Sequence, residues 1–319
     1  MTGDTQETSN KRRTSPIKAG SLSFAIDKFS DDCLPLQYLR ELTQNSVEAI
    51  PEGNQGNVKW SYDPNWKDKN GSLKLCIVDD GIGMTGRDIS KYINTMWESG
   101  KGLGRTENFG MGVKISAGPK NPHGIEYYTW KDGVGYFATF WYDEDINDYG
   151  MELIEDENGG LVDWLEDIDD KFMPPLIRKN GGNGVKVVLL GRGEDEDTFL
   201  NSDAQMPSRW IEYNLNNRYY KIPENVKISA RRIDGEKIPS AKLGLVKGIE
   251  KRLSRHSEDK GTVDLSDGKL HWMLLTEPEI RHKFTEFDSG AQSGVVFHNE
   301  IYEKQNKMGH RSRMASKFG

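Results

Sequence analysis

Hydrophobic side chains recur every three or four positions along residues 36–50, which is the spacing of one face of an α-helix. Asp31 or Asp32 can cap the start of this helix, and Pro51 ends it. The apolar face consists of Leu36, Leu39, Thr43, Val47 and Ile50. We therefore predict a helix that runs to Ile50 and buries one face in a core.

A row of polar residues runs beside this apolar face. Glu41, Asn45 and Glu48 follow one another at steps of four and three, so they lie on one side of the helix. An amphipathic helix normally carries charge on its solvent side, and the row taken alone is explained in that way. The segments that follow give the row a second interpretation.

Apolar runs separated by turn residues follow the helix and predict β-strands. Up to residue 191 these runs are residues 58–62, 73–78, 125–130, 133–142 and 185–191. Residues 86–97 return to helical spacing, and five glycines between Gly100 and Gly112 form a loop that leads into a short helix at 113–117. A sheet covered by helices that come mainly from the first half predicts an α+β fold, a two-layer α/β sandwich.

The pattern of predicted helices and strands changes near residue 205, where we place a domain boundary. A helix is predicted at residues 209–219, and later strands are predicted at 226–233, 269–275 and 294–303. The expected organisation is a leader at 1–20, a first domain at 21–205 and a smaller mixed α/β domain at 206–319.

Composition narrows the class of protein. The 319 residues are 35% hydrophobic and 29% charged. No apolar stretch approaches the roughly 20 residues of a membrane span, and residues 1–20 lack the hydrophobic centre of a signal peptide, so we expect a disordered leader and no membrane partner. The two cysteines, Cys33 and Cys76, favour a reduced, cytoplasmic protein. None of the six histidines lies in an HExxH or CxxC setting, which argues against zinc.

Charge is distributed unevenly along the chain. The net charge is −7, and residues 143–170 hold thirteen acidic residues without a lysine or arginine. This segment lacks the spacing of a calcium loop, so we interpret it as a solvated acidic insertion. The tail at 304–317 has five positive residues and no acid. It could contact DNA or lie on the chain's own acidic surface, and the sequence leaves both open.

The stretch VDDGIGMTG contains the most informative glycines. Gly81, Gly83 and Gly86 fit the GxGxxG pattern of dinucleotide-binding folds, between a predicted strand and a predicted helix. Asp79 and Asp80 precede them, however, and two carboxylates would repel a diphosphate. A second glycine loop also stands where that fold needs its next strand. We therefore predict that Asp79 accepts a hydrogen bond from an amino group such as that of adenine, and that the second loop meets the phosphates.

Three segments together resemble the GHKL ATPase superfamily, which comprises gyrase, the ninety-kilodalton heat-shock chaperones, histidine kinases and MutL mismatch-repair proteins, with the MORC ATPases as relatives. The matching residues are Glu41 and Asn45 in ELTQNSVEA, then Asp79, Gly81 and Gly83 of DxGxG, then Gly110, Met111 and Gly112 of the glycine-rich lid. The sequences of these motifs most resemble those of the chaperone and MORC branches. The resemblance implies a Bergerat-type ATP-binding fold with ATP and Mg²⁺ as cofactors.

The same resemblance implies roles for individual residues. Glu41 would orient and deprotonate the water that attacks the γ-phosphate, and Asn45 would be the protein ligand of Mg²⁺. Ala49 is the small residue that lets base and helix pack closely, with Glu48 beside it as an outer contact. Family members carry a Gly-Thr pair on a later strand, whereas here Gly184 precedes Val185, so the usual hydroxyl is missing. The remaining nucleotide contacts are predicted at Met84, Ser99, Gly100, Lys101, Phe109, Val113 and Lys114.

The function implied by the resemblance is slow Mg²⁺-dependent ATP hydrolysis. We expect it to be coupled to lid closure over residues 98–112 and to an ATP-dependent homodimer, in a chaperone-like or DNA-associated machine with a DNA or protein client. Residues 206–319 would resemble a transducer domain with a basic tail. A non-hydrolysing regulatory module is one alternative. A histidine-kinase-type phosphotransfer domain is another, although that branch typically lacks the equivalent of Glu41.

Overall fold

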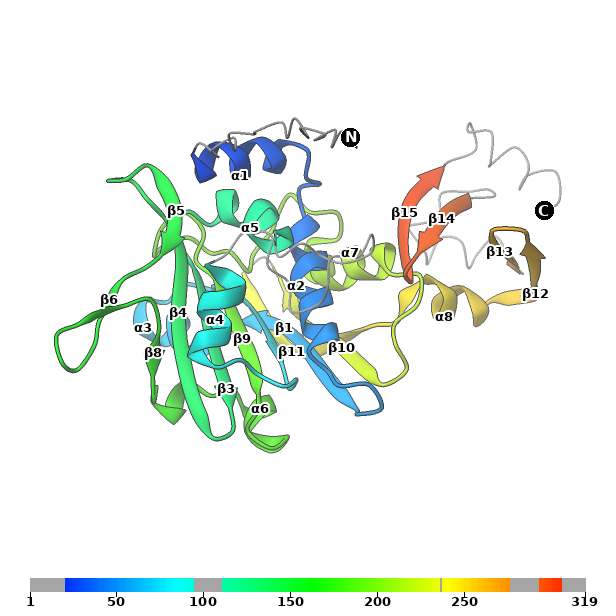
Figure 1. Ribbon diagram of the computed structural model, residues 1–319. Helices are drawn as coiled ribbons and strands as arrows, with labels where there is room; N and C mark the ends of the chain where they lie inside the picture. Colours follow the sequence, from blue (N-terminus) through cyan, green and yellow to red (C-terminus); the bar gives the residue numbers. More distant parts are fainter. Residues whose placement is uncertain (1–20, 95–110, 236, 276–292, 306–319) are drawn as a thin grey trace, which may run out of the picture.

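The computed structural model describes residues 21–94, 111–235, 237–275 and 293–305, and its centre is one large mixed sheet (Figure 1). Nine strands form this sheet: β1 (Gly56–Tyr62), β2 (Leu75–Asp79), β3 (Ile125–Lys131), β4 (Val134–Asp143), β5 (Asp148–Met151), β8 (Leu165–Glu166), β9 (Gly184–Leu189), β10 (Val226–Asp234) and β11 (Ile238–Val246). Their order is β11-β10-β1-β2-β9-β3-β4-β5, with β8 paired to β4. β1 and β10 run parallel, and the other pairs in the sheet are antiparallel.

Helices cover both faces of the sheet. The main core lies under α1 (Leu22–Asp31), α2 (Gln37–Glu48), α4 (Gly86–Ile93), α5 (Gly112–Ala117) and α7 (Trp210–Arg218). A smaller core on the other face is closed by α3 (Pro64–Asn70) and α6 (Pro175–Lys179). In β2, Leu75 and Ile77 join the main core and Cys76 and Val78 join the smaller one. This mixed α/β architecture is compatible with the α+β class predicted from the sequence.

The predicted helix at 36–50 is found as α2, but it begins later than its proposed caps. Asp31 closes α1, a helix that the sequence analysis did not predict, and the N-cap position of α2 is Leu36. The amide of Leu34 is bound by the side chain of Gln37, which satisfies a donor at the start of α2 without an aspartate cap. The predicted helix at 86–97 is shorter as well, since Asn94 is the C-cap of α4.

The acidic segment at 143–170 is partly built into the fold. It supplies β5, β8 and the short pair β6 (Ile154–Glu155) and β7 (Leu161–Val162). Asp148 accepts hydrogen bonds from the amides of Leu22 and Ser23 at 3.3 and 2.6 Å, so it caps α1. The ring of Trp164 lies against Gly86 at the start of α4. A purely solvated insertion is therefore too simple a description of this segment.

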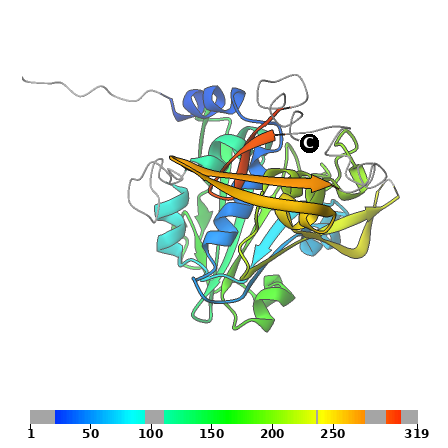
Figure 2. The ribbon, with the colours of Figure 1, turned by 90° about the vertical axis from the view of Figure 1, so that its right-hand side faces the viewer.

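The sheet continues past the boundary predicted near residue 205, because β10 and β11 extend it beyond β1. After α8 (Gly248–Ser254) come two hairpins, β12 (Ser257–Leu265) with β13 (Gly268–Leu275) and β14 (Ser293–Phe297) with β15 (Glu300–Gln305). They lie beside α7 and α8, toward the viewer in Figure 2. The single strand predicted at 294–303 is thus wrong. His298 and Asn299 adopt φ of 47° and 66° and turn the chain back.

Within the described ranges, no helix combines the length and the apolar character needed to cross a membrane.

Candidate functional site

α2 carries the candidate catalytic residue into the interior of the protein. Glu41 is only 4% exposed, whereas Asn45 and Glu48 of the predicted polar row are exposed. Thr43 fixes α2 to β1, because its hydroxyl donates to the Leu39 carbonyl at 2.6 Å and accepts from the Trp60 indole at 3.0 Å. The row is therefore not uniform: its first member is buried and its later members face outward.

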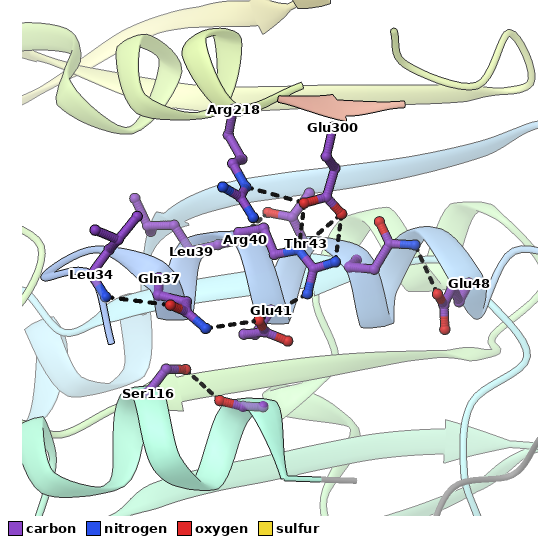
Figure 3. Close-up of polar contacts among 12 residues, drawn as sticks. Leu34, Gln37, Leu39, Arg40, Glu41, Thr43, Glu48, Ser116, Arg218 and Glu300 are labelled. Atoms are coloured by element: carbon purple, nitrogen blue, oxygen red, sulfur yellow. Dashed lines mark hydrogen bonds and ion pairs between the residues drawn. The ribbon is translucent and has the colours of Figure 1, made fainter. Parts of the chain in front are cut away.

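Glu41 is held on one of its two carboxylate oxygens. Oε1 accepts from Arg40 Nη1 at 2.8 Å and from Gln37 Nε2 at 3.4 Å (Figure 3). Oε2 faces Gly112, so closely that a Cβ at position 112 would overlap it. Gly112 is thus required for the approach of α5 to α2. The predicted proximity of Glu41 and the second glycine segment is present in the structure.

Asp79 lies at the end of β2, directly beside the same helix. Its carboxylate accepts from the Ser46 hydroxyl at 2.9 Å and from the Gly81 amide at 3.0 Å. Burial raises the pKa of Asp79 to about 7, although the two hydrogen bonds oppose this shift. Asp79 is therefore a buried acceptor whose charge is only partly compensated. Sequence reasoning missed Ser46, although its position four residues before Ile50 places it on the buried side of α2.

The glycines after Asp79 allow two close contacts of backbone with neighbouring elements. A Cβ at Gly81 would lie 2.7 Å from the Ala49 Cβ, and the amide of Ile82 donates to the Ala49 carbonyl at 3.0 Å. Gly83 has a φ of 65°, and a Cβ there would overlap the carbonyl of Trp130 on β3. Ala49 and the two glycines therefore join α2, this turn and the sheet.

Replacing Gly83 with alanine is expected to lower the free energy of unfolding by about 2–3 kcal/mol, because both the left-handed backbone and the Trp130 carbonyl oppose a side chain. Gly133→Ala is the matched control. Gly133 also has a positive φ, of 85°, but a Cβ there would meet nothing within 4 Å. We expect this variant to lose only about 1 kcal/mol in urea unfolding. Equal losses in the two variants would show that the contact with β3 is unimportant.

Val185 and Met84 complete the base of the site. Val185 is buried on β9, between Asp79 on one side and Thr129 on the other. The Thr129 hydroxyl accepts from the Met84 amide at 2.6 Å and fixes the turn that contains Gly83. Val185 has no hydroxyl, but the Ser46 hydroxyl binds Asp79 and the Thr129 hydroxyl binds the turn that follows Asp79. Thr129 was also not predicted as a site residue, since it belongs to no motif.

The start of α5 is the part of the second glycine loop that the structure describes. Met111 and Val113 are half-buried. Lys114 is buried, and its ammonium donates to the Tyr92 carbonyl at 3.0 Å. Burial lowers the pKa of Lys114 to about 8. The other predicted contacts, Ser99, Gly100, Lys101, Phe109 and Gly110, lie outside the described residues.

The described residues can supply one metal ligand at this site. Asn45 is exposed one helical turn after Glu41, and its carboxamide has no hydrogen bond to another described residue. Among the residues that the structure describes, no group of three or more His, Cys, Asp or Glu is suited to hold a metal ion. A single amide oxygen fits Mg²⁺, which often keeps water and phosphate oxygens as its other ligands.

No protein-family model matches the sequence, and no curated protein matches it.

Proposed function

We propose that this chain binds ATP with Mg²⁺ and hydrolyses it slowly, as a GHKL-type ATPase with a Bergerat-type nucleotide site. One observation carries the proposal: two segments far apart in sequence, residues 79–83 and the start of α5, meet on α2. Gly112 lies against Glu41, Gly81 lies against Ala49, and Asp79 is bound by Ser46. These contacts bring two buried carboxylates and two glycine segments to one helix, which supports the proposal.

The residues divide into a base-binding end and a reacting end. Asp79 offers a buried carboxylate to an exocyclic amino group, and glycine at position 81 lets a flat ring approach the backbone. Glu41 points its Oε2 toward the second glycine segment, where the phosphates would lie. It would take a proton from water while the water oxygen bonds to the γ-phosphorus and the bond to the β-phosphate oxygen breaks. Asn45 would hold Mg²⁺, which neutralises phosphate charge.

Replacing Asn45 with alanine is expected to weaken binding of an ATP analogue about tenfold in the presence of Mg²⁺ and to change it less than twofold without Mg²⁺. Isothermal titration calorimetry with and without the metal measures both affinities. Gln44→Ala is the control, since Gln44 precedes Asn45 and binds Glu48 at 2.7 Å on the exposed side of α2. A loss that is the same with and without Mg²⁺ would exclude Asn45 as the metal ligand.

The proposed ATPase would also use segments beyond this site. Lid closure over residues 98–112 falls largely outside the described residues, as does the basic tail at 304–317 that could contact DNA. An ATP-dependent homodimer, a DNA or protein client, a transducer-like role for residues 206–319 and a cytoplasmic location stay predictions from the sequence. A salt titration of DNA binding tests the tail, because phosphate contacts weaken as salt rises.

A further inference from the structure

Glu300, the first residue of β15, is a buried carboxylate with two arginine partners. It is 1% exposed. Its oxygens accept from Arg40 Nε at 2.8 and 2.9 Å and from Arg40 Nη2 at 2.5 Å, and Arg218 Nε donates at 3.1 Å (Figure 3). Such charge-assisted, multiply bonded pairs are stronger and more directional than single neutral hydrogen bonds. Glu300 therefore fixes Arg40 in one orientation.

The hairpin that carries Glu300 is fastened to the end of α7 by backbone contacts. The Asn299 carbonyl in its turn accepts from the amides of Tyr220 and Lys221 at 2.7 and 3.2 Å. Arg218 Nη1 also donates to the Ile301 carbonyl at 3.1 Å. The position of Glu300 beside α2 is thus set by the docking of the β14–β15 turn, and not by its own side chain alone.

Arg40 connects this hairpin to the candidate base. Its Nε and Nη2 face Glu300, while Nη1 lies 2.8 Å from Glu41 Oε1. Burial disfavours the charged guanidinium, but the hydrogen bonds and charges of Glu300 and Glu41 outweigh it and raise the pKa of Arg40. Because the guanidinium is planar and rigid, its orientation on Glu300 determines where Nη1 meets Glu41. Oε2 then faces Gly112.

We propose that Glu300 is a positioning residue for Glu41, acting through Arg40, so that the docked β14–β15 hairpin sets the rate of ATP hydrolysis. This inference rests on the proposed ATPase function and adds a regulating element to it. Two arginines and two glutamates balance one another in this cluster. Without the Glu300 charge, Arg40 loses the partner that fixes its plane, and the Glu41 carboxylate loses its fixed orientation.

The test compares steady-state ATP hydrolysis by the full chain and by Glu300→Gln. Glutamine keeps the shape but lacks the charge and the second acceptor oxygen. We expect kcat to fall about tenfold, because a small misplacement of a catalytic group has a large effect on rate, while KM and the Kd of a non-hydrolysable ATP analogue stay within about twofold. Glu300→Asp, which keeps the charge on a shorter side chain, should recover part of kcat. Glu224→Gln is the control, since Glu224 is 90% exposed in its side chain.

A double-mutant cycle identifies Arg40 as the connection. In an Arg40→Gln background, Glu300→Gln should change kcat by less than about twofold, because the path from Glu300 to Glu41 is already lost. Amide hydrogen exchange at Tyr220 and Lys221 reports whether the hairpin stays docked, and we expect these amides to remain protected in Glu300→Gln.

Three results would overturn the inference. The first is an unchanged kcat in folded Glu300→Gln and Glu300→Asp while the wild-type chain hydrolyses ATP. The second is a tenfold loss that persists in the Arg40→Gln background, and the third is an equal loss in Glu224→Gln. If the wild-type chain shows no ATP turnover, the proposed function fails, and this inference fails with it.

Discussion

Replacing Glu41 with glutamine is expected to lower ATP turnover at least about 100-fold, while the Kd of a non-hydrolysable ATP analogue stays within about twofold. A positioned general base typically contributes 10²–10⁴ to the rate. Glutamine keeps the size of the side chain and an oxygen for Arg40, but it cannot take a proton from water. Phosphate release and calorimetric titration of the same preparation measure the two quantities.

The control for this variant is Glu52→Gln, which removes the same charge from an exposed position just after α2. Its turnover should match that of the wild-type chain. Turnover that persists in Glu41→Gln together with normal analogue binding would remove the hydrolase and leave a non-hydrolysing ATP-binding module. Loss of analogue binding would instead place Glu41 in the binding site and leave its catalytic role unsupported.

Replacing Asp79 with asparagine is expected to stabilise the ligand-free protein above pH 7 by a few kcal/mol, and to weaken ATP binding at least about tenfold. The pKa of Asp79 is raised from 3.8 to about 7 by burial, so between these values the folded state holds a proton that the unfolded state has released. Stability associated with this group therefore falls as the pH rises from about 4 to about 7. Each unit of the shift corresponds to about 1.4 kcal/mol.

Thermal unfolding of the wild-type chain and Asp79→Asn at pH 5 and pH 8 tests this prediction. The advantage of the variant should be larger at pH 8 than at pH 5, since asparagine does not titrate and can still bind Ser46 and the Gly81 amide. An equal gain in stability of Asp79→Asn at pH 5 and pH 8 would show that burial does not raise the pKa of the Asp79 carboxylate. Unchanged ATP affinity in the variant would exclude Asp79 as the adenine acceptor.

Helical spacing predicted α2, and the family resemblance grouped Ala49, Gly81 and Gly112 around one nucleotide. The close contacts that Gly81 makes with Ala49 and Gly112 makes with Glu41 are features of the structure that no single motif encodes. The burial of Glu41 was not predictable in the same way. An amphipathic pattern assigns charged residues to the solvent side, whereas α5 and Arg40 lie against Glu41 and make this position an interior one.

Two features of the C-terminal part could not be predicted from the sequence, and each has a physical reason. His298 and Asn299 turn the chain with positive φ but without glycine, so the turn has no strong signature and the sequence predicts one strand where the structure has two. The pairing of Arg40 with Glu300 joins residues 260 positions apart. Charge pairing at that separation is decided by the docking of the hairpin, and no periodicity within either segment encodes it.

The parallel pairing of β1 with β10 has a consequence for how the protein holds together. β1 forms hydrogen bonds with β2 on one side and with β10 on the other, so a strand of the first half of the chain depends on a ladder supplied by residues 226–230. A chain cut at residue 205 would expose that side of β1 as a bare edge able to pair with other molecules. The two halves of the sequence are therefore expected to melt in one cooperative transition.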